Sequence, residues 1–531
     1  MSAGIPAGAA PLAARAPVAR AGSPAVRLAL ALLGGSALAA AFAPLTLWPL
    51  AILAPALLMW LWQDAPARES ARLAFAFSFG TFACGTYWLY HSVHVIGGAP
   101  LWLAFVLMLG LAAAMGLFYA ALGYVAGRWL PQRGAVRWLL ALPAAWLLLE
   151  WFRGWFLSGF SWLSLGYSQS DTWLAGVSPL LGVYGISALL LLQAGALVTL
   201  CLGTRGERLL ALAALALPWM LGAALYGHDW THPSAAPLDV AIVQGAVPQD
   251  EKWLEQYRAS TLERYEALTG QLWGARLIVW PESATASLAN DITDYLSRLY
   301  GRARDHRAAL VMGILRADNG PDGVRYYNSV LALDAGVSWY DKRHLVPFAE
   351  FFPVPHFVRS WLRLMSLPYS DFTRGRADQA ALPAAGLHLG TTICYEDAYG
   401  SAMLPVLHEA DALVNVTNDA WFGDSSARHQ HFQIARFRAL EAGRYLVRAA
   451  NDGISAVIGP HGEVVARAAE FTPQTLRARI TPMQGLTPYA YVGNWLAVGV
   501  MTLVLAYSLW LGNDRARRAR KTAPDQKLTE T

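Results

Sequence analysis

Charged residues are scarce in this sequence. Only 15% of its 531 residues are charged, and 55% are hydrophobic, whereas an average soluble protein is roughly a quarter charged. Such a composition excludes an intrinsically disordered chain and argues against an ordinary soluble enzyme. The scarcity is also uneven, because residues 1–236 carry 17 charged side chains and the remaining residues carry 60. We therefore expect a membrane-embedded first part followed by a domain of soluble composition.

Cysteine is rare as well. The three cysteines, Cys84, Cys201 and Cys394, stand far apart and form no CxxC pair, which argues against a disulfide framework and a structural zinc site. Cys84 and Cys201 lie in apolar runs, where a small buried side chain is expected.

The net charge of +5 comes from the first part of the chain. No basic face is left for a phosphate backbone, so nucleic acid is not an expected partner.

Eight apolar stretches are long enough to be considered as membrane spans, since a helix needs about 20 mostly apolar residues to cross a bilayer. The last follows the soluble domain, and the others precede it. The connection at residues 156–173 is amphipathic and is expected to lie in the membrane interface. The predicted spans are 26–44, 46–63, 73–93, 100–127, 138–156, 174–202, 209–226 and 490–511.

Basic residues orient these spans. The flanks and connections on one side hold 16 Lys and Arg residues, and the opposite short connections hold only Arg153. Because short basic loops stay in the cytoplasm, both termini are expected inside and the soluble domain outside. This predicts a seven-span bundle at 1–229, an extracytoplasmic domain at 230–488, and an eighth span with a basic tail at 489–531. The basic residues are Arg15, Arg20, Arg27, Arg68, Arg72, Arg128, Arg133, Arg137, Arg205, Arg208, Arg515, Arg517, Arg518, Arg520, Lys521 and Lys527.

From residue 238 onward, short apolar strand-like runs alternate with helical stretches, a pattern typical of an α/β domain with covered sheet faces. The expected strands are 238–247, 275–284, 308–317, 327–334, 387–397, 410–419, 445–451 and 454–460, and the expected helices are 251–271, 288–306, 400–408 and 428–444.

Three polar residues interrupt the ends of apolar strand-like runs: Glu282 ends IVWPE, Lys342 follows VSWYD, and Cys394 lies in TTICYED. An acid, an amine and a thiol are the parts of a nucleophilic acyl-transfer site. A free thiol has a pKa of about 8.5 and needs a base or a positive field near neutral pH. Glu282 could accept the thiol proton, and Lys342 could stabilise the thiolate and an oxyanion.

The contexts of these residues, WPESA, YDKRHLVPFAEF and ICYED, resemble the nitrilase (carbon–nitrogen hydrolase) superfamily. Combined with eight spans, the resemblance narrows to the apolipoprotein N-acyltransferase family. It implies an α-β-β-α sandwich in which Glu282 is the general base, Lys342 stabilises the oxyanion and Cys394 is the nucleophile. It also implies supporting or substrate-binding roles for Trp253, Glu350, Tyr395 and Glu396.

The same resemblance implies a reaction without a cofactor. Cys394 takes an acyl chain from a membrane phospholipid, with phosphatidylethanolamine as the expected donor, and forms a thioester. The N-terminal amine of an S-diacylglyceryl cysteine on an apolipoprotein then accepts the chain, which gives a triacylated lipoprotein. The expected setting is a monomer in the bacterial inner membrane with its catalytic domain in the periplasm.

Two other functions remain open on the sequence. A membrane-tethered amidase of the nitrilase type would keep the triad and use water as acceptor. A transporter or lipoprotein-binding chaperone would carry a degenerate enzyme domain, but the spans hold few of the ionisable groups that transport paths contain. Asn418 and Asp419 are interpreted as turn residues. His429 and His431 do not share a helix face, and no metal site is expected.

Overall fold

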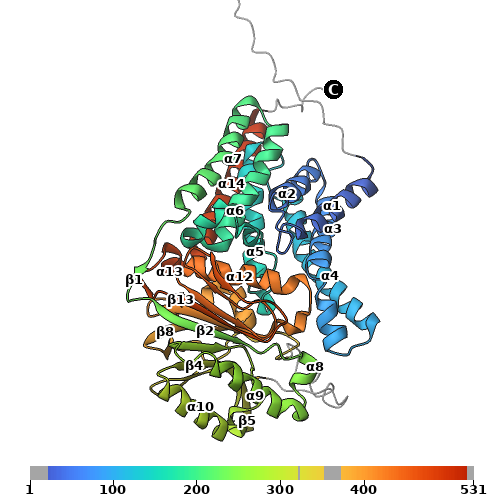
Figure 1. Ribbon diagram of the computed structural model, residues 1–531. Helices are drawn as coiled ribbons and strands as arrows, with labels where there is room; N and C mark the ends of the chain where they lie inside the picture. The colour runs from blue at the N-terminus through green and yellow to red at the C-terminus, as the bar shows by residue number, and fades with distance from the viewer. Residues whose placement is uncertain (1–21, 321–322, 352–371, 523–531) are drawn as a thin grey trace, which may run out of the picture.

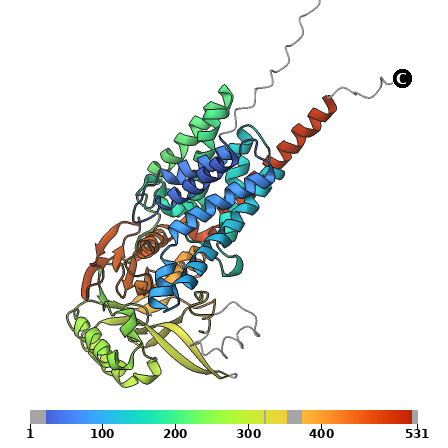
Figure 2. The same ribbon diagram turned by 90° about the vertical axis from the view of Figure 1, so that its right-hand side faces the viewer.

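A helical bundle stands on a β-sandwich in the computed structural model of this protein (Figure 1), which describes residues 22–320, 323–351 and 372–522. The bundle and the sandwich occupy opposite ends of the molecule in a second view as well (Figure 2). Arg15, Arg20 and Lys527 of the predicted basic flanks lie outside the described residues. The two-part organisation agrees with the uneven distribution of charge along the sequence.

Helices occur at all eight predicted spans, but only four helical segments of the described residues have the length and composition to cross a membrane. These are Leu101–Arg128, Trp173–Leu202, Arg205–Leu225 and Trp495–Gly512. Of the eight predicted spans, four are therefore confirmed as helices that are long and apolar enough to cross a membrane. The bundle helices are α1 (Pro24–Ala39), α2 (Leu50–Leu61), α3 (Ala67–Gly85), α4 (Leu101–Arg128), α5 (Leu142–Arg153), α6 (Ser178–Leu202), α7 (Arg205–Leu225) and α14 (Trp495–Thr522).

The other helices are shorter or more polar for local reasons. Helix α2 has 12 residues, which corresponds to about 18 Å at 1.5 Å per residue, short of the ~30 Å hydrocarbon core. The first two turns of α3 contain Arg68, Glu69 and Arg72 and are therefore polar. Helix α5 is preceded by a π-helical segment, η2 (Val136–Ala141).

The bundle contradicts one expectation and qualifies another. Cys84 and Cys201 are exposed, because apolar side chains of a membrane-type bundle face outward as well as inward. The interface position of the connection after α5 stays a prediction, but this connection is not exposed along its whole length. Its residues 161–170, which include the 3-10 helix η4 (Leu165–Gln169), are buried, and they contact the sandwich through bonds such as that from Ser161 Oγ to Ala398 O.

The sandwich consists of two six-stranded sheets, with strand orders β13-β2-β3-β4-β5-β6 and β12-β11-β10-β9-β8-β7. The first comprises β2 (Leu238–Gln244), β3 (Leu277–Trp280), β4 (Ala309–Gly320), β5 (Gly323–Leu333), β6 (Val337–Asp341) and β13 (Gln474–Ile480). The second comprises β7 (Leu382–Ala384), β8 (Leu387–Ile393), β9 (Ala412–Thr417), β10 (Leu446–Ala450), β11 (Ala456–Ile458) and β12 (Val464–Arg467).

Helices cover both outer faces of the paired sheets. Apolar residues of the two sheets, such as Val279 and Val414, share one buried core. Helices α9 (Glu255–Gly270) and α10 (Thr293–Asp305) pack on the first sheet, and α12 (Ser426–Ala442) packs on the second. The α/β prediction and the α-β-β-α layering are confirmed, although the helix expected at 400–408 is two short 3-10 turns, η8 (Gly400–Ala402) and η9 (Leu404–Val406).

Strand direction gathers the ends of several strands at one edge. Strands β2, β3 and β4 are parallel, and β6 runs the same way because two antiparallel pairings separate it from β4. In the facing sheet β8, β9 and β10 are parallel. The residues that follow β3, β6 and β8 are therefore the ones that can meet, and Glu282, Lys342 and Cys394 are among them.

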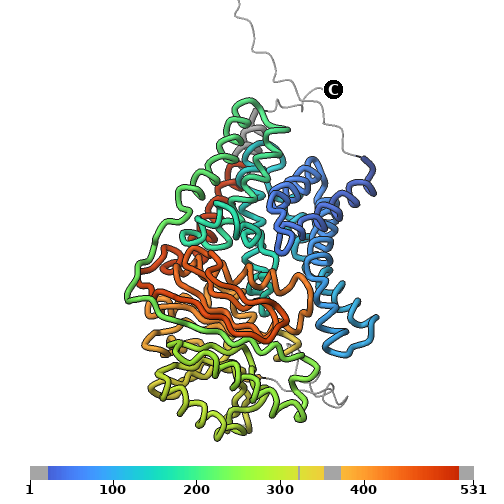
Figure 3. The backbone as a smooth tube through the Cα atoms, in the orientation of Figure 1, coloured from blue at the N-terminus to red at the C-terminus, as the bar shows by residue number. Residues whose placement is uncertain are grey.

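The chain enters and leaves the sandwich at one place. Figure 3 shows it descending from the end of α7 along the side of the molecule into the first sheet. On this path β1 (His232–Pro233) pairs antiparallel with β14 (Met483–Gln484), which precedes α13 (Pro488–Val492) and α14. The two connections to the bundle are thus joined to each other.

Candidate active site

Lys342 lies between two carboxylates in the interior of the sandwich. Its Nζ is 2.9 Å from Glu350 Oε1 and 3.3 Å from Glu282 Oε1, and its side chain is 1% exposed. Burial alone lowers the pKa of a lysine, but the charges of Glu350 and Glu282 outweigh it and raise the pKa of Lys342 above its usual range. Lys342 is therefore a permanent cation at the site.

Two asparagines fix the carboxylates. Asn328 Nδ2, on β5, donates to Glu282 Oε1 at 2.7 Å and to Glu350 Oε1 at 2.9 Å. The main-chain N–H of Asn418, just after β9, donates to Glu282 Oε2 at 3.0 Å. Oε1 of Glu282 thus has a donor from the first sheet and Oε2 has a donor from the second, and the carboxylate is held in one orientation.

Cys394 follows β8 and begins the short 3-10 helix η7 (Cys394–Ala398). Its φ of 51° lies in the left-handed region, which is strained for a residue with a Cβ and recurs at nucleophiles placed on sharp turns after strands. Burial, followed by the charge of Glu282, raises the pKa of the thiol, whereas Lys342 lowers it. The thiol is thus within electrostatic reach of both groups and is protonated at neutral pH.

Glu396 fixes the turn that follows Lys342. Its Oε1 accepts hydrogen bonds from the N–H groups of Arg343 at 2.7 Å and His344 at 3.0 Å. Its Oε2 accepts from Ile393 N at 2.8 Å and Tyr340 Oη at 2.9 Å. The Glu396 carboxylate therefore joins the segment that carries Lys342 to the segment that carries Cys394. The sequence indicated a supporting role for Glu396 only through the family resemblance.

Tyr395 and Trp253 lie at the margins of the site. Tyr395 Oη donates to Gly159 O of the bundle at 3.2 Å, and its ring stacks on Trp162 with centroids 6.3 Å apart. Trp253 is 48% exposed, and Lys252 Nζ lies 5.9 Å from the centre of its ring. The seven predicted residues thus form an inner group of Glu282, Lys342, Glu350, Cys394 and Glu396, with Tyr395 and Trp253 around it.

Sequence reasoning missed four contributors. Lys252 is buried and donates to the main-chain oxygen of Glu282 at 3.2 Å. Asn328 lies within an apolar strand run and was not identified, although a buried amide within a strand is a signal of a hydrogen-bonded partner. Asn418 directly precedes the 3-10 helix η10 (Asp419–Phe422), but its side chain donates to Gln249 Oε1 at 2.8 Å and does not cap the turn. His431 contacts the Cys394 carbonyl oxygen at 3.1 Å.

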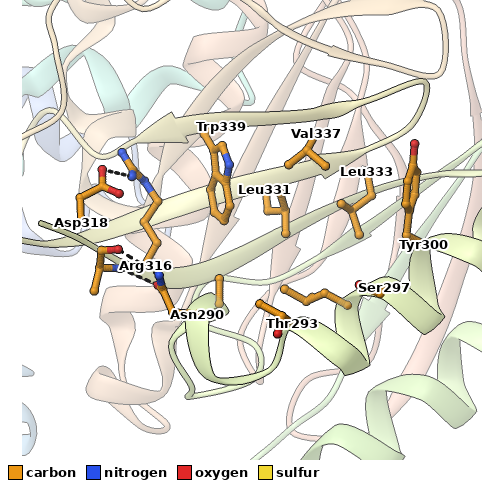
Figure 4. Close-up of a pocket in the computed structure, with 13 residues that line it drawn as sticks. Asn290, Thr293, Ser297, Tyr300, Arg316, Asp318, Leu331, Leu333, Val337 and Trp339 are labelled. Carbon is orange, nitrogen blue, oxygen red and sulfur yellow. Dashed lines mark hydrogen bonds and ion pairs between the residues drawn. The ribbon is translucent and has the colours of Figure 1, made fainter.

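A pocket on the first sheet is separate from this site. It has a volume of about 320 Å³ and lies between α10 and strands β4 to β6 (Figure 4). Arg316, Trp339 and Tyr300 line it, and none of the seven predicted residues does. The pocket is shallow and mostly apolar. A salt bridge lies beside it, in which Arg316 Nη2 is 2.7 Å from Asp341 Oδ2.

The inner group can perform acyl transfer through a thiol. A transfer of the Cys394 proton to Glu282 creates a thiolate and neutralises a carboxylate, so the net charge of the site does not change. Lys342 stays paired with Glu350 throughout, and its cation is available to an oxyanion. The arrangement therefore separates a proton acceptor from a permanent cation, as covalent catalysis by a thiol requires.

Comparisons with known proteins agree with this arrangement. Residues 34–196 match the apolipoprotein N-acyltransferase N-terminal domain, and residues 239–489 match the carbon-nitrogen hydrolase family. The chain is 40% identical to the apolipoprotein N-acyltransferase of Methylococcus capsulatus over 94% of its length and 97% of the relative's. It is 42% identical to that of Azotobacter vinelandii, with 93% and 96% covered. On the match along both of its parts, the chain belongs to the apolipoprotein N-acyltransferase family.

Proposed function

We propose that this protein moves an acyl chain from a membrane phospholipid to the N-terminal amine of the S-diacylglyceryl cysteine of an apolipoprotein. The observation that carries the proposal is the buried Glu282–Lys342–Glu350 cluster beside Cys394, at the sandwich edge that adjoins an apolar bundle. Phosphatidylethanolamine is the proposed donor. The site holds every group the reaction needs from the protein, so no cofactor is invoked.

In the first half-reaction Cys394 Sγ attacks the ester carbonyl carbon and Glu282 accepts the thiol proton. Lys342 Nζ stabilises the oxyanion of the tetrahedral intermediate. When the intermediate collapses, the carbon–oxygen bond to the lipid breaks and the proton on Glu282 passes to the departing oxygen. A lysophospholipid leaves, and a thioester remains on Cys394.

In the second half-reaction the α-amino nitrogen attacks the thioester carbonyl. Glu282, again a carboxylate, accepts a proton from the amine. The carbon–sulfur bond then breaks, the amide product leaves, and the proton returns from Glu282 to the thiolate. Division into two steps replaces one direct ester-to-amide exchange by two reactions with lower barriers.

The supporting residues have separate proposed roles. Glu350 orients Lys342, and Glu396 fixes the turn after Lys342 against the segment that carries Cys394. Tyr395 connects the site to the bundle through Gly159. Trp253, which is 48% exposed, and Trp421, which is 40% exposed, supply apolar surface for acyl chains. Each methylene that such surface buries contributes about 0.8 kcal/mol.

Contacts at the two ends of the bundle support a path with eight spans. At the end away from the sandwich, the connection after α4 bonds both to the connection after α2 and to the first turn of α7. Arg133 Nη2 is 3.0 Å from Asp64 Oδ1, and Ala135 N donates to Glu207 Oε1 at 2.8 Å.

The intervening connections instead reach the sandwich. Ala43 N donates to Gln433 Oε1 at 3.3 Å, and Ser92 Oγ donates to Trp421 O at 2.7 Å. With the basic side in the cytoplasm, residues 230–488 face the periplasm of a bacterial inner membrane, and 1–229 and 489–531 form the membrane part of a monomer.

A membrane-tethered amidase is the second candidate function, because the same cluster could pass the acyl group to water. The many cross-contacts between site and bundle favour the lipid-dependent reaction. Tyr399 Oη, for example, donates to Ser158 O at 3.0 Å and to Gly159 O at 3.1 Å. A soluble amide would need neither the bundle nor this attachment.

Mass spectrometry of the purified protein tests the proposal. After incubation with vesicles of phosphatidylethanolamine, the peptide that contains Cys394 should gain the mass of one acyl chain. Addition of a synthetic S-diacylglyceryl cysteine peptide should remove that mass and place it on the peptide's amine. No acylation of Cys394 would contradict the mechanism, and equal discharge with and without the peptide would favour the amidase.

A further inference from the structure

A buried network of charged groups lies behind Cys394 and has no role in the steps above. Arg448, on β10, is fully buried, with Nη2 at 3.0 Å from Asp419 Oδ2 and Nη1 at 3.3 Å from Asp397 Oδ2. His431, on α12, is 1% exposed, and its Nδ1 is 2.9 Å from Asp419 Oδ1. Its other ring nitrogen, Nε2, is 3.1 Å from the carbonyl oxygen of Cys394.

The hydrogen on Nε2 of His431 follows from its partner. A carbonyl oxygen can only accept, so Nε2 carries a hydrogen and donates it to Cys394 O. At the opposite side of the ring, Asp419 and Arg448 Nη2, which is 3.0 Å from Nδ1, fix the orientation of the imidazole. An imidazole held from both sides aims a single donor at the peptide of the nucleophile.

That donor acts on a strained residue. Cys394 has a φ of 51°, which a residue with a Cβ keeps only where its surroundings enforce it. Because the C=O and N–H of a trans peptide point in opposite directions, anchoring of Cys394 O on His431 also directs the N–H of Tyr395 away from the histidine. The N–H of the residue after a nucleophile is a common oxyanion donor.

We propose that His431, fixed by Asp419 and Arg448, is a positioning residue that holds the Cys394 peptide in its reactive conformation. In this role it acts through the Cys394 carbonyl and not on the substrate or the thiol. The inference rests on the proposed function, in which Cys394 is the nucleophile.

The same histidine joins the nucleophile to the bundle. Its ring lies 5.6 Å, between centroids, from Trp162, and Trp162 Nε1 donates to Gln430 Oε1 at 2.7 Å. Trp162 also stacks on Tyr395, the residue after Cys394. The buried turn between α5 and α6 therefore supports the positioning network from the membrane side.

Two substitutions separate the hydrogen bond from the ring packing. In His431→Gln the amide nitrogen can reach the place of Nε2, so the donor to Cys394 O is retained. In His431→Asn the shorter side chain cannot reach it. Both variants lose the contact with Trp162. We expect acyl-Cys394 to form at least tenfold more slowly in His431→Asn, with an unchanged apparent KM for phosphatidylethanolamine, and within about threefold of the native rate in His431→Gln.

A matched control and a replacement variant test whether the effect is specific to the His431 contact with Cys394. His429→Asn makes the same change two residues earlier on α12, on another helix face, and should acylate at the native rate. If His431→Asn does not fold, judged by thermal melting, Asp419→Asn replaces it, with slower acylation at unchanged KM expected. A native rate in the variant used, or equal losses in His431→Asn and His431→Gln, would overturn the positioning role. Failure of the unaltered protein to form acyl-Cys394 would instead contradict the proposed function.

Discussion

Lys342 and Glu350 are joined by a buried ion pair of 2.9 Å, shorter than the 3.3 Å between Lys342 and Glu282. Asn328 Nδ2 donates to the same oxygen of Glu350, and Val346 N donates to the other at 2.8 Å. Glu350 could either orient Lys342 or assist the incoming amine. These contacts favour orientation of Lys342, because Glu350 makes the closer ion pair with its ammonium and is itself held by Asn328 and Val346.

Glu350→Gln should therefore slow both half-reactions to a similar degree. The neutral amide still accepts one hydrogen bond but no longer holds the Lys342 cation by charge. Since Lys342 serves the oxyanion in each step, we expect a loss on the order of 100-fold in each, comparable to removal of one oxyanion donor. Single-turnover mass spectrometry of Cys394 measures the two rates separately.

Accumulation of acyl-Cys394 in this variant, persisting after the apolipoprotein peptide is added, would contradict the orienting role. It would mean that Glu350 acts mainly on the amine. Glu350→Asp provides a control, because it retains the charge and changes only its reach.

The thiol of Cys394 should react slowly with alkylating agents at neutral pH. Burial and the neighbouring Glu282 raise its pKa, and the thiolate is the reactive form. In a Cys84→Ala, Cys201→Ala background, the iodoacetamide rate should rise with pH and reach half its maximum above the ordinary thiol value of about 8.5. A half-maximal rate below that pH would show that the site favours the thiolate instead.

Cys394→Ala should abolish acyl transfer, whereas Cys84→Ala and Cys201→Ala should leave it within about twofold of the native rate. The latter two cysteines are exposed on α3 and α6, and exposed substitutions away from special features usually change stability by less than about 0.5 kcal/mol. The measurement is N-acylation of a diacylglyceryl peptide by each variant. Retained N-acylation in Cys394→Ala would remove the nucleophile from the mechanism.

Much of the sandwich could be predicted from its apolar strand runs. Strands β2, β3, β8 and β9 lie inside the expected ranges, because strands covered on both faces leave a continuous apolar signal. The polar residues that end such runs could be recognised for the same reason. The sequence therefore predicts Glu282, Lys342 and Cys394 as a group.

The partners of this group could not be predicted, because they depend on packing between distant segments. Asn328 contacts Glu282 across 46 residues, and His431 contacts Cys394 across 37. A single polar residue within an apolar or helical run can mark a buried contact, but it does not identify the distant residue that it contacts. The lengths of α1 and α2 were also overestimated, because hydropathy does not register that Pro44 and Pro49 interrupt the apolar run between these two helices.

The orientation of the bundle gives a further prediction. Reporter fusions placed at Arg205–Arg208 and near Asp291 should report opposite sides of the membrane, the first cytoplasmic and the second periplasmic. Glu207, in the same first turn of α7 as Arg205, accepts a hydrogen bond from Ala135 N of the basic connection after α4, whereas Asp291 lies in the sandwich. Signals from the same side would contradict the eight-span path, and reversed signals would contradict its orientation.

Glu282→Gln should block formation of acyl-Cys394 while the fold is retained. Glutamine has a single acceptor oxygen, so it keeps the contact with Asn328 or that with Asn418 N, but not both. Its amide cannot accept the thiol proton, and loss of a general base costs about 10²–10⁴ in rate. The expected readout is the absence of the acyl mass on Cys394 at times when the native protein is fully acylated, together with a thermal melting point that stays near the native value.

Acylation of Cys394 within tenfold of the native rate would mean that the proton leaves by another route. In that case Glu282 would serve only as the counter-charge of Lys342, and Glu282→Ala, which leaves Lys342 with Glu350 alone, should then be no slower than Glu282→Gln.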